Sequence, residues 1–126
     1  MTIALWCVLI TGLLPYLGTA AAKWGFRHFD NNDPRAWLAK QTGFRARGNA
    51  AQHNSFEAFP FFAAAVIIAT MLKASPSAVN ALAIVFIAAR VGFLVCYVSD
   101  KASLRSVFWF VGLLSVIAIF VVAAAA

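Results

Sequence analysis

The sequence predicts an all-α integral membrane protein, a four-helix bundle in a single domain over residues 1–126. Of the 126 residues, 63% are hydrophobic and 11% are charged, whereas a soluble domain carries about 25% charged residues. The mean hydropathy is +0.87. The apolar residues form long runs, and a run of about 18 or more with few charges is a candidate membrane span. Residues typical of turns separate four such runs.

The first helix is expected over about residues 2–22. No Lys or Arg precedes Lys23, so the run lacks the basic start of a secretory signal and is expected to be retained. Pro15 falls inside this run, where neighbouring membrane helices tolerate it. A polar segment follows, and its centre, FDNNDPRAW, has the Asn, Asp and Pro of a loop.

Three further helices are expected over about residues 43–72, 78–98 and 104–124. The motif LKASPSA separates the second helix from the third, with Pro76 as the helix breaker. The motif SDKAS separates the third from the fourth.

The basic residues predict the orientation, because Lys and Arg are enriched in cytoplasmic loops. They concentrate in the first and third connections, and the middle turn carries Lys73 alone. Both termini are therefore expected outside. No organelle address is visible, so a bacterial inner membrane is expected. The basic residues of the two connections are Lys23, Arg27, Arg35, Lys40, Arg45, Arg47, Lys101 and Arg105.

Neither nucleic acid nor metal binding is expected. The net charge is +6, but the basic residues form no continuous face with interleaved aromatics. Cys7 and Cys96 lie inside apolar runs, where small buried hydrophobic residues are expected. His53 has no second His or Cys at ligand spacing, and His28 lies in a loop.

Two ionisable residues within the expected helices are candidates for function, Glu57 and Arg90. Such residues are costly in a membrane and tend to face the bundle interior. Because the second and third helices run in opposite directions, the two residues lie at similar depth and could form a pair. The alternative is a buried ion pair that only fixes the helix register.

Other polar residues surround these two at the same end of the bundle. Arg47, Asn54 and Glu57 share one broad face of the second helix. Tyr97 and Arg105 lie at the boundary, where an interfacial tyrosine and a flanking basic residue are the ordinary interpretation. Together these residues predict a basic pocket for an anionic, peptide-like ligand. Apolar walls between helices would admit a small lipophilic substrate from the bilayer.

The pattern of these residues resembles the MAPEG superfamily, the membrane-associated proteins in eicosanoid and glutathione metabolism, in a bacterial-type member. The resemblance covers essentially the whole chain. It implies a left-handed four-helix bundle that assembles as a homotrimer, with glutathione as co-substrate between neighbouring subunits. The residues that carry it are Arg47, Gln52-His53-Asn54, Glu57, Phe59-Pro60-Phe61, Ala89-Arg90, Tyr97 and Arg105.

The resemblance also implies roles for individual residues. Arg105 falls where the thiol-activating arginine of leukotriene synthases lies, and its charge would favour the thiolate that attacks an electrophile. The implied glutathione-binding residues are Lys23, Arg47, Gln52, Asn54, Glu57, Arg90 and Tyr97.

The chain departs from the glutathione-conjugating members at three positions. Ala50 stands where those members have a second arginine, and Ala58 and Phe93 stand where they have tyrosines. The function expected is a glutathione-dependent transferase or peroxidase acting on lipophilic electrophiles. The departures keep open a non-catalytic membrane scaffold. A small proton-coupled exporter is the third alternative, although such exporters place an acidic residue in the first helix, which here has none.

Overall fold

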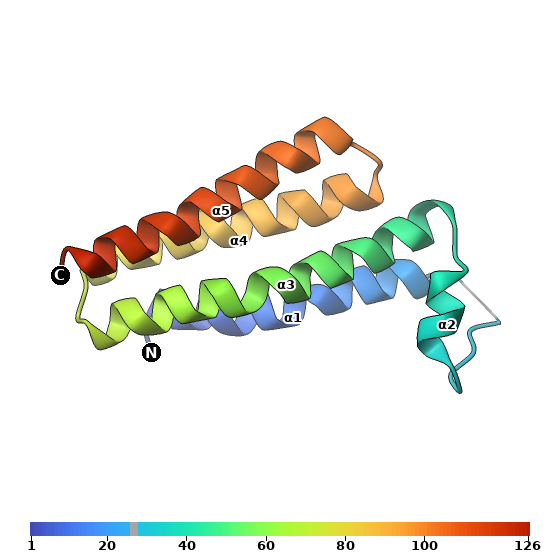
Figure 1. Cartoon of the computed structure of the whole chain (residues 1–126), viewed down its shortest axis with the longest axis horizontal. Helices are drawn as coiled ribbons and strands as arrows, with labels where there is room; N and C mark the ends of the chain where they lie inside the picture. Colours follow the sequence, from blue (N-terminus) through green and yellow to red (C-terminus); the bar gives the residue numbers. More distant parts are fainter. Residues whose placement is uncertain (26–27) are drawn as a thin grey trace.

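Four long helices and one short helix make up the chain in a computed structural model, which describes residues 1–25 and 28–126 (Figure 1). The described residues contain no strand, and the predicted all-α bundle is confirmed. The helices are α1 (Ile3–Lys23), α2 (Pro34–Ala39), α3 (Gly43–Met71), α4 (Pro76–Val98) and α5 (Ala102–Ala124).

The four long helices α1, α3, α4 and α5 are each long and apolar enough to cross a membrane. In a bilayer a helix satisfies its own backbone hydrogen bonds, which is why apolar runs of this length become helices. The helix α4 begins at Pro76 rather than at residue 78, because proline is compatible with the first turn of a helix. The cysteines behave as predicted, since Cys7 and Cys96 are buried free thiols.

The short helix α2 lies where the sequence indicated only a loop. Asp33 precedes it, and its side chain accepts a hydrogen bond from the backbone N–H of Ala36 at 3.3 Å. Pro34 occupies the first turn, where its missing N–H is not needed. The dipeptide Asp-Pro was therefore a helix start as well as a turn signal, and this helix was missed.

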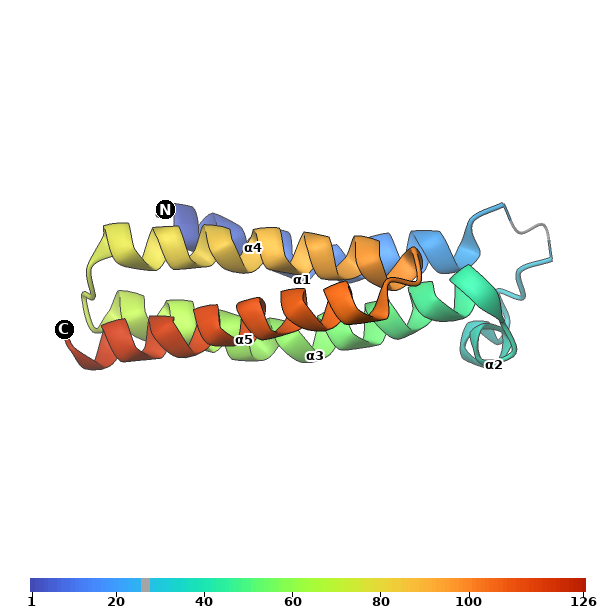
Figure 2. The ribbon, with the colours of Figure 1, turned by 90° about the horizontal axis from the view of Figure 1, so that it is seen from above.

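Both termini lie at one end of the bundle, and α2 lies at the other end together with the α4–α5 connection (Figures 1 and 2). The basic residues of the first and third connections therefore share one end, which we call the basic end. Lys73 lies in the turn at the end that carries the termini. Arg27, which we counted among the basic residues, lies outside the described residues.

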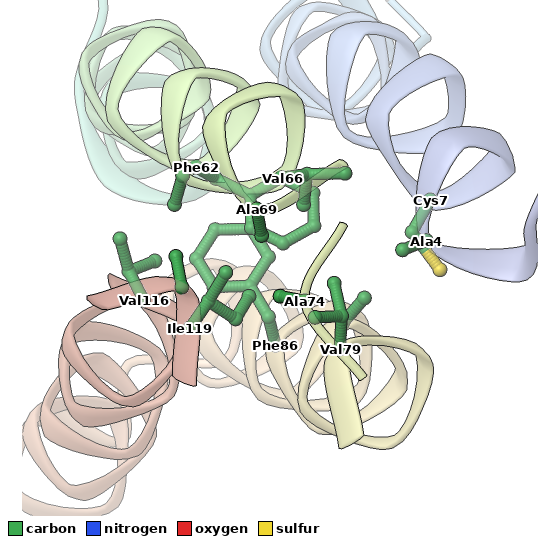
Figure 3. Packing of buried hydrophobic residues seen from close by; sticks show 13 residues of the cluster. Ala4, Cys7, Phe62, Val66, Ala69, Ala74, Val79, Phe86, Val116 and Ile119 are labelled. Atoms are coloured by element: carbon green, nitrogen blue, oxygen red, sulfur yellow. The ribbon is translucent and has the colours of Figure 1, made fainter. Parts of the chain in front are cut away.

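The apolar core lies between the four long helices (Figure 3). At its centre the rings of Phe62 on α3 and Phe86 on α4 stack with centroids 4.0 Å apart and planes 5° apart. Val66, Val116 and Ile119 surround this pair and are buried. The core thus joins the α1–α3 side of the bundle to the α4–α5 side.

Two glycines bring the backbones of α1 and α3 into direct contact. A Cβ atom on Gly18 would lie 2.8 Å from the backbone nitrogen of Gln52 and 2.9 Å from the carbonyl oxygen of Gly48. A Cβ atom on Gly48 would lie 2.8 Å from the nitrogen of Ala22. Close approach at small residues is a common way for membrane helices to pack. This crossing fixes α3 against α1 at the level of Gln52.

Candidate functional site

Arg90 lies in the interior of the bundle and is held by side chains of α3. The residue is only 3% exposed. Its Nη2 donates to Asn54 Oδ1 at 2.8 Å and to Ser55 Oγ at 3.4 Å. Its guanidinium carbon lies 4.2 Å from the centroid of the Phe93 ring. A buried charge requires such partners, since its water has been removed.

The pair expected between Arg90 and Glu57 is not present among the described residues. Asn54 lies about one turn before Glu57 on α3 and Ser55 lies about half a turn before it, and both reach the guanidinium instead. Glu57 is exposed, and it lines the same hollow as Arg90. Its carboxylate therefore remains available to a ligand.

This first hollow, which we call the inner hollow, has a volume of about 220 Å³ and lies between α3, α4 and α5. Asn54, Glu57 and Arg90 supply its polar groups, and the other lining side chains are mainly apolar. Two small residues, Ala58 and Gly112, leave the space open. The remaining lining residues are Phe61, Phe86, Trp109, Leu113 and Val116.

A second hollow of about 250 Å³ adjoins the first toward the basic end, and we call it the boundary hollow. Arg105 lines it, with its guanidinium carbon 4.3 Å from the centroid of the Tyr97 ring. Asn54 and Trp109 line both hollows. The remaining lining residues are Phe93, Ser106 and Phe110. Arg90 and Arg105 thus line adjoining hollows, and the side chain of Asn54 lines both of them.

Arg47 and Lys23 lie outside both hollows in the single chain. The Nε of Arg47 donates at 3.1 Å to the carbonyl oxygen of Val98, the last residue of α4. A cation at this position satisfies a carbonyl that the helix leaves unpaired. The Nζ of Lys23, at the end of α1, lies 4.1 Å from the centroid of the Phe29 ring.

Gln52 lies in a third hollow, on a different side of α3 from Asn54. We call it the α2 hollow; its volume is about 520 Å³, and it lies between α2 and α3. Its lining residues are Arg35, Leu38, Ala39, Asn49, Gln52, His53 and Phe56. Of the residues expected to bind glutathione, Asn54 and Tyr97 line the boundary hollow with Arg105, and Glu57 and Arg90 line the adjoining inner hollow. The structure places Lys23, Arg47 and Gln52 elsewhere.

A comparison with protein families decides the family of this chain. The model of the MAPEG family matches residues 3–125, nearly the whole length. The chain belongs to the MAPEG family. No curated protein matches it.

Family membership and the four apolar helices together make this MAPEG protein an integral, multi-pass membrane protein. The family predicted from the residue pattern is thus confirmed.

Ser55 and Trp109 are among the residues of the site that sequence reasoning missed. A serine next to Asn54 in an apolar helix is a signal for an internal hydrogen bond, and Ser55 is indeed buried against Arg90. The sequence did not identify Trp109 as a site residue, because tryptophan is common in membrane helices near the boundary. Its place between the two hollows follows from the packing of α5.

Proposed function

We propose that this MAPEG protein is a glutathione-dependent transferase or peroxidase that acts on lipophilic electrophiles. The observation that carries the proposal is the position of Arg90 and Arg105 on two adjoining hollows that share Asn54. A charged residue inside a membrane bundle is a candidate for function. Arg90, Arg105 and the carboxylate of Glu57 lie around the Asn54 amide. Together they suit a ligand that carries both carboxylates and an amine.

Glutathione has this chemistry. A carboxylate suits the planar guanidinium of Arg90, and the amine suits Glu57. Arg105 lies toward the basic end, where its positive charge lowers the cost of a thiolate. The thiol proton leaves to water at that end, and the sulfur then forms a bond to the electrophilic carbon of the second substrate. The carbon transfers its electron pair to a leaving group or to a conjugated acceptor.

The apolar part of the inner hollow, away from Glu57 and Arg90, is the proposed site of the lipophilic substrate. Ala58 lines this hollow, and the resemblance implies a tyrosine at that position in glutathione-conjugating members. The missing ring leaves apolar space beside Phe61 and Phe86. Alanine at position 58 therefore removes a glutathione contact that the resemblance implies. It also enlarges the inner hollow for the second substrate.

The proposed assembly is a homotrimer with glutathione between subunits, on the cytoplasmic side of a bacterial inner membrane and with both termini outside. In the single chain Lys23, Arg47 and Gln52 lie outside the two hollows that Arg90 and Arg105 serve. A site that uses all of them needs residues from a second copy. The positive-inside rule supports a cytoplasmic basic end.

Calorimetry of glutathione binding to the detergent-solubilised protein tests the proposal. We expect saturable binding, and we expect Arg105→Ala to abolish the thiolate absorbance while the oligomer stays intact. Lys101→Ala is the matched control, since Lys101 is an exposed cation at the start of α5 and lines neither hollow.

The absence of glutathione binding at millimolar concentration contradicts the enzyme proposal. With an intact oligomer, that result supports the alternative of a non-catalytic membrane scaffold. Ala50, Ala58 and Phe93 favour this alternative, because each removes a contact that the resemblance implies. In a scaffold, Arg90→Leu would dissociate or unfold the oligomer.

A further inference from the structure

The α2 hollow is separate from the two hollows that Arg90 and Arg105 line. We propose that it binds the phosphate-bearing head group of an anionic membrane lipid. None of the residues that converge on Arg90 and Arg105 lines this hollow. Gln52 is the one lining residue that the resemblance also implies for glutathione, so competition by glutathione is part of the test.

The place of the hollow suits a lipid head group. It lies between α2 and α3 at the basic end, and its volume of about 520 Å³ exceeds that of the inner and boundary hollows. Figure 1 shows α2 beside the first turns of α3, beyond the end of α1. A pocket at this level lies near the lipid phosphate groups, at the boundary between the bilayer and water.

The polar lining of the hollow suits a phosphate that carries hydroxyl groups. Arg35 supplies a guanidinium, which is the preferred partner of phosphate oxygens. His53 and Asn49 add ring and amide nitrogens that can donate. The Oε1 of Gln52 is buried and finds no donor among the described residues. A ligand that brings an O–H group beside the phosphate, as a glycerol head group does, would satisfy this oxygen once the Gln52 side chain turns toward the hollow that it lines.

The apolar lining favours a membrane lipid over a soluble phosphate compound. Phe56 lines the hollow and packs edge-to-face against Tyr16 of α1, with ring centroids 6.0 Å apart. Both rings are exposed, at 45% and 58%. Leu13 and Leu17 on α1 are also exposed. These side chains extend an apolar surface from the hollow toward the hydrocarbon, along which an acyl chain can lie.

Native mass spectrometry of the full chain in detergent tests the site, with phosphatidylglycerol and phosphatidylcholine of identical chains as probes. We expect preferential retention of phosphatidylglycerol. Ala39→Trp fills the hollow from the exposed face of α2, and Ala36→Trp adds the same ring to α2 outside the hollow. Arg35→Gln removes an exposed cation that lines the hollow, and Lys40→Gln removes an exposed cation that does not line it.

The lining variants should lower the preference for phosphatidylglycerol by about fivefold or more, the effect of one basic residue at an anionic lipid. The two control variants should retain it within about twofold, because neither Ala36 nor Lys40 lines the hollow. Circular dichroism of each variant establishes that α2 and the bundle remain folded.

Four results would overturn the inference. Equal losses in Arg35→Gln and Lys40→Gln would indicate diffuse charge attraction, and an unchanged preference in Ala39→Trp would show that the hollow is not the site. Displacement of the lipid by millimolar glycerol phosphate would identify a soluble phosphate as the ligand. Displacement by glutathione would assign the hollow to the glutathione site. Loss of glutathione binding in Arg105→Ala with unchanged lipid retention separates this proposal from the enzyme proposal.

Discussion

Arg90 of α4 donates to the side-chain oxygen of Asn54 on α3 at 2.8 Å, and this hydrogen bond connects two helices inside the bundle. Both residues line the inner hollow. The same bond therefore stabilises the bundle and positions a guanidinium beside the space where we propose that a substrate lies.

Substitution of Asn54 should destabilise the protein. Asn54→Ala leaves Arg90 with Ser55 as its remaining hydrogen-bond partner among the described residues, and losing a hydrogen bond to a charged group costs about 1.5–3 kcal/mol. We expect a lower melting temperature in detergent. Asn54→Asp keeps an acceptor and should retain most of the stability. Asn49→Ala, in the α2 hollow, is the control, and an equal loss there would contradict the prediction.

The contact between the backbones of α1 and α3 should not accept a side chain. Gly48→Ala places a Cβ 2.8 Å from a backbone nitrogen of α1, and overpacking of this kind costs about 1–3 kcal/mol. Gly12→Ala is the control, because its Cβ would meet the Phe59 ring at 3.4 Å, and a ring can move. Thermal unfolding of the two variants compares them. Equal melting temperatures would show that α1 and α3 separate easily.

A tyrosine at position 58 should close the inner hollow. Ala58→Tyr fills much of the volume of about 220 Å³, so turnover of a bulky lipophilic electrophile should fall more than turnover of a small one. Steady-state kinetics with small and large electrophiles measures the change. Ala64→Tyr adds the same ring at an exposed position on α3 and should leave the kinetics unchanged. Unaltered selectivity in Ala58→Tyr would place the second substrate elsewhere.

Arg47 should stabilise the C-terminal end of α4 within its own chain. Arg47→Ala frees the carbonyl oxygen of Val98, and we expect a loss of about 1 kcal/mol with faster hydrogen exchange in residues 96–101. Lys40→Ala, at the exposed end of α2, should have no such effect. If Arg47 also contacts glutathione from a neighbouring subunit, as the resemblance implies, glutathione affinity will fall by more than the stability loss explains.

The fold could be predicted from the sequence because the bilayer allows few structures. Long apolar runs in a membrane must be helices, and breakers such as Pro76 locate their ends. The helix α2 was missed because it is short and its start, Asp33-Pro34, is equally typical of a turn. Length and amphipathicity give no signal for a helix of six residues.

The sequence identified several residues of the candidate site, but it did not predict which of them contact one another. Ionisable residues in apolar helices identified Arg90 and Glu57, but depth along a helix does not separate Glu57 from Asn54, which lies about one turn away. The preference of Arg90 for Asn54 depends on the rotation of α3, which the glycine contact with α1 helps to fix. The assignment of Gln52 to the α2 hollow depends on the same rotation.

The position of the two termini has a practical consequence. Both emerge at the end of the bundle opposite α2 and the α4–α5 connection (Figures 1 and 2). A reporter fused to either terminus therefore stays a full membrane thickness away from Arg105 and from the α2 hollow. A pair of such fusions will report the same compartment. A label at Lys101, in contrast, will report the other compartment, so one set of three labelled proteins determines the orientation.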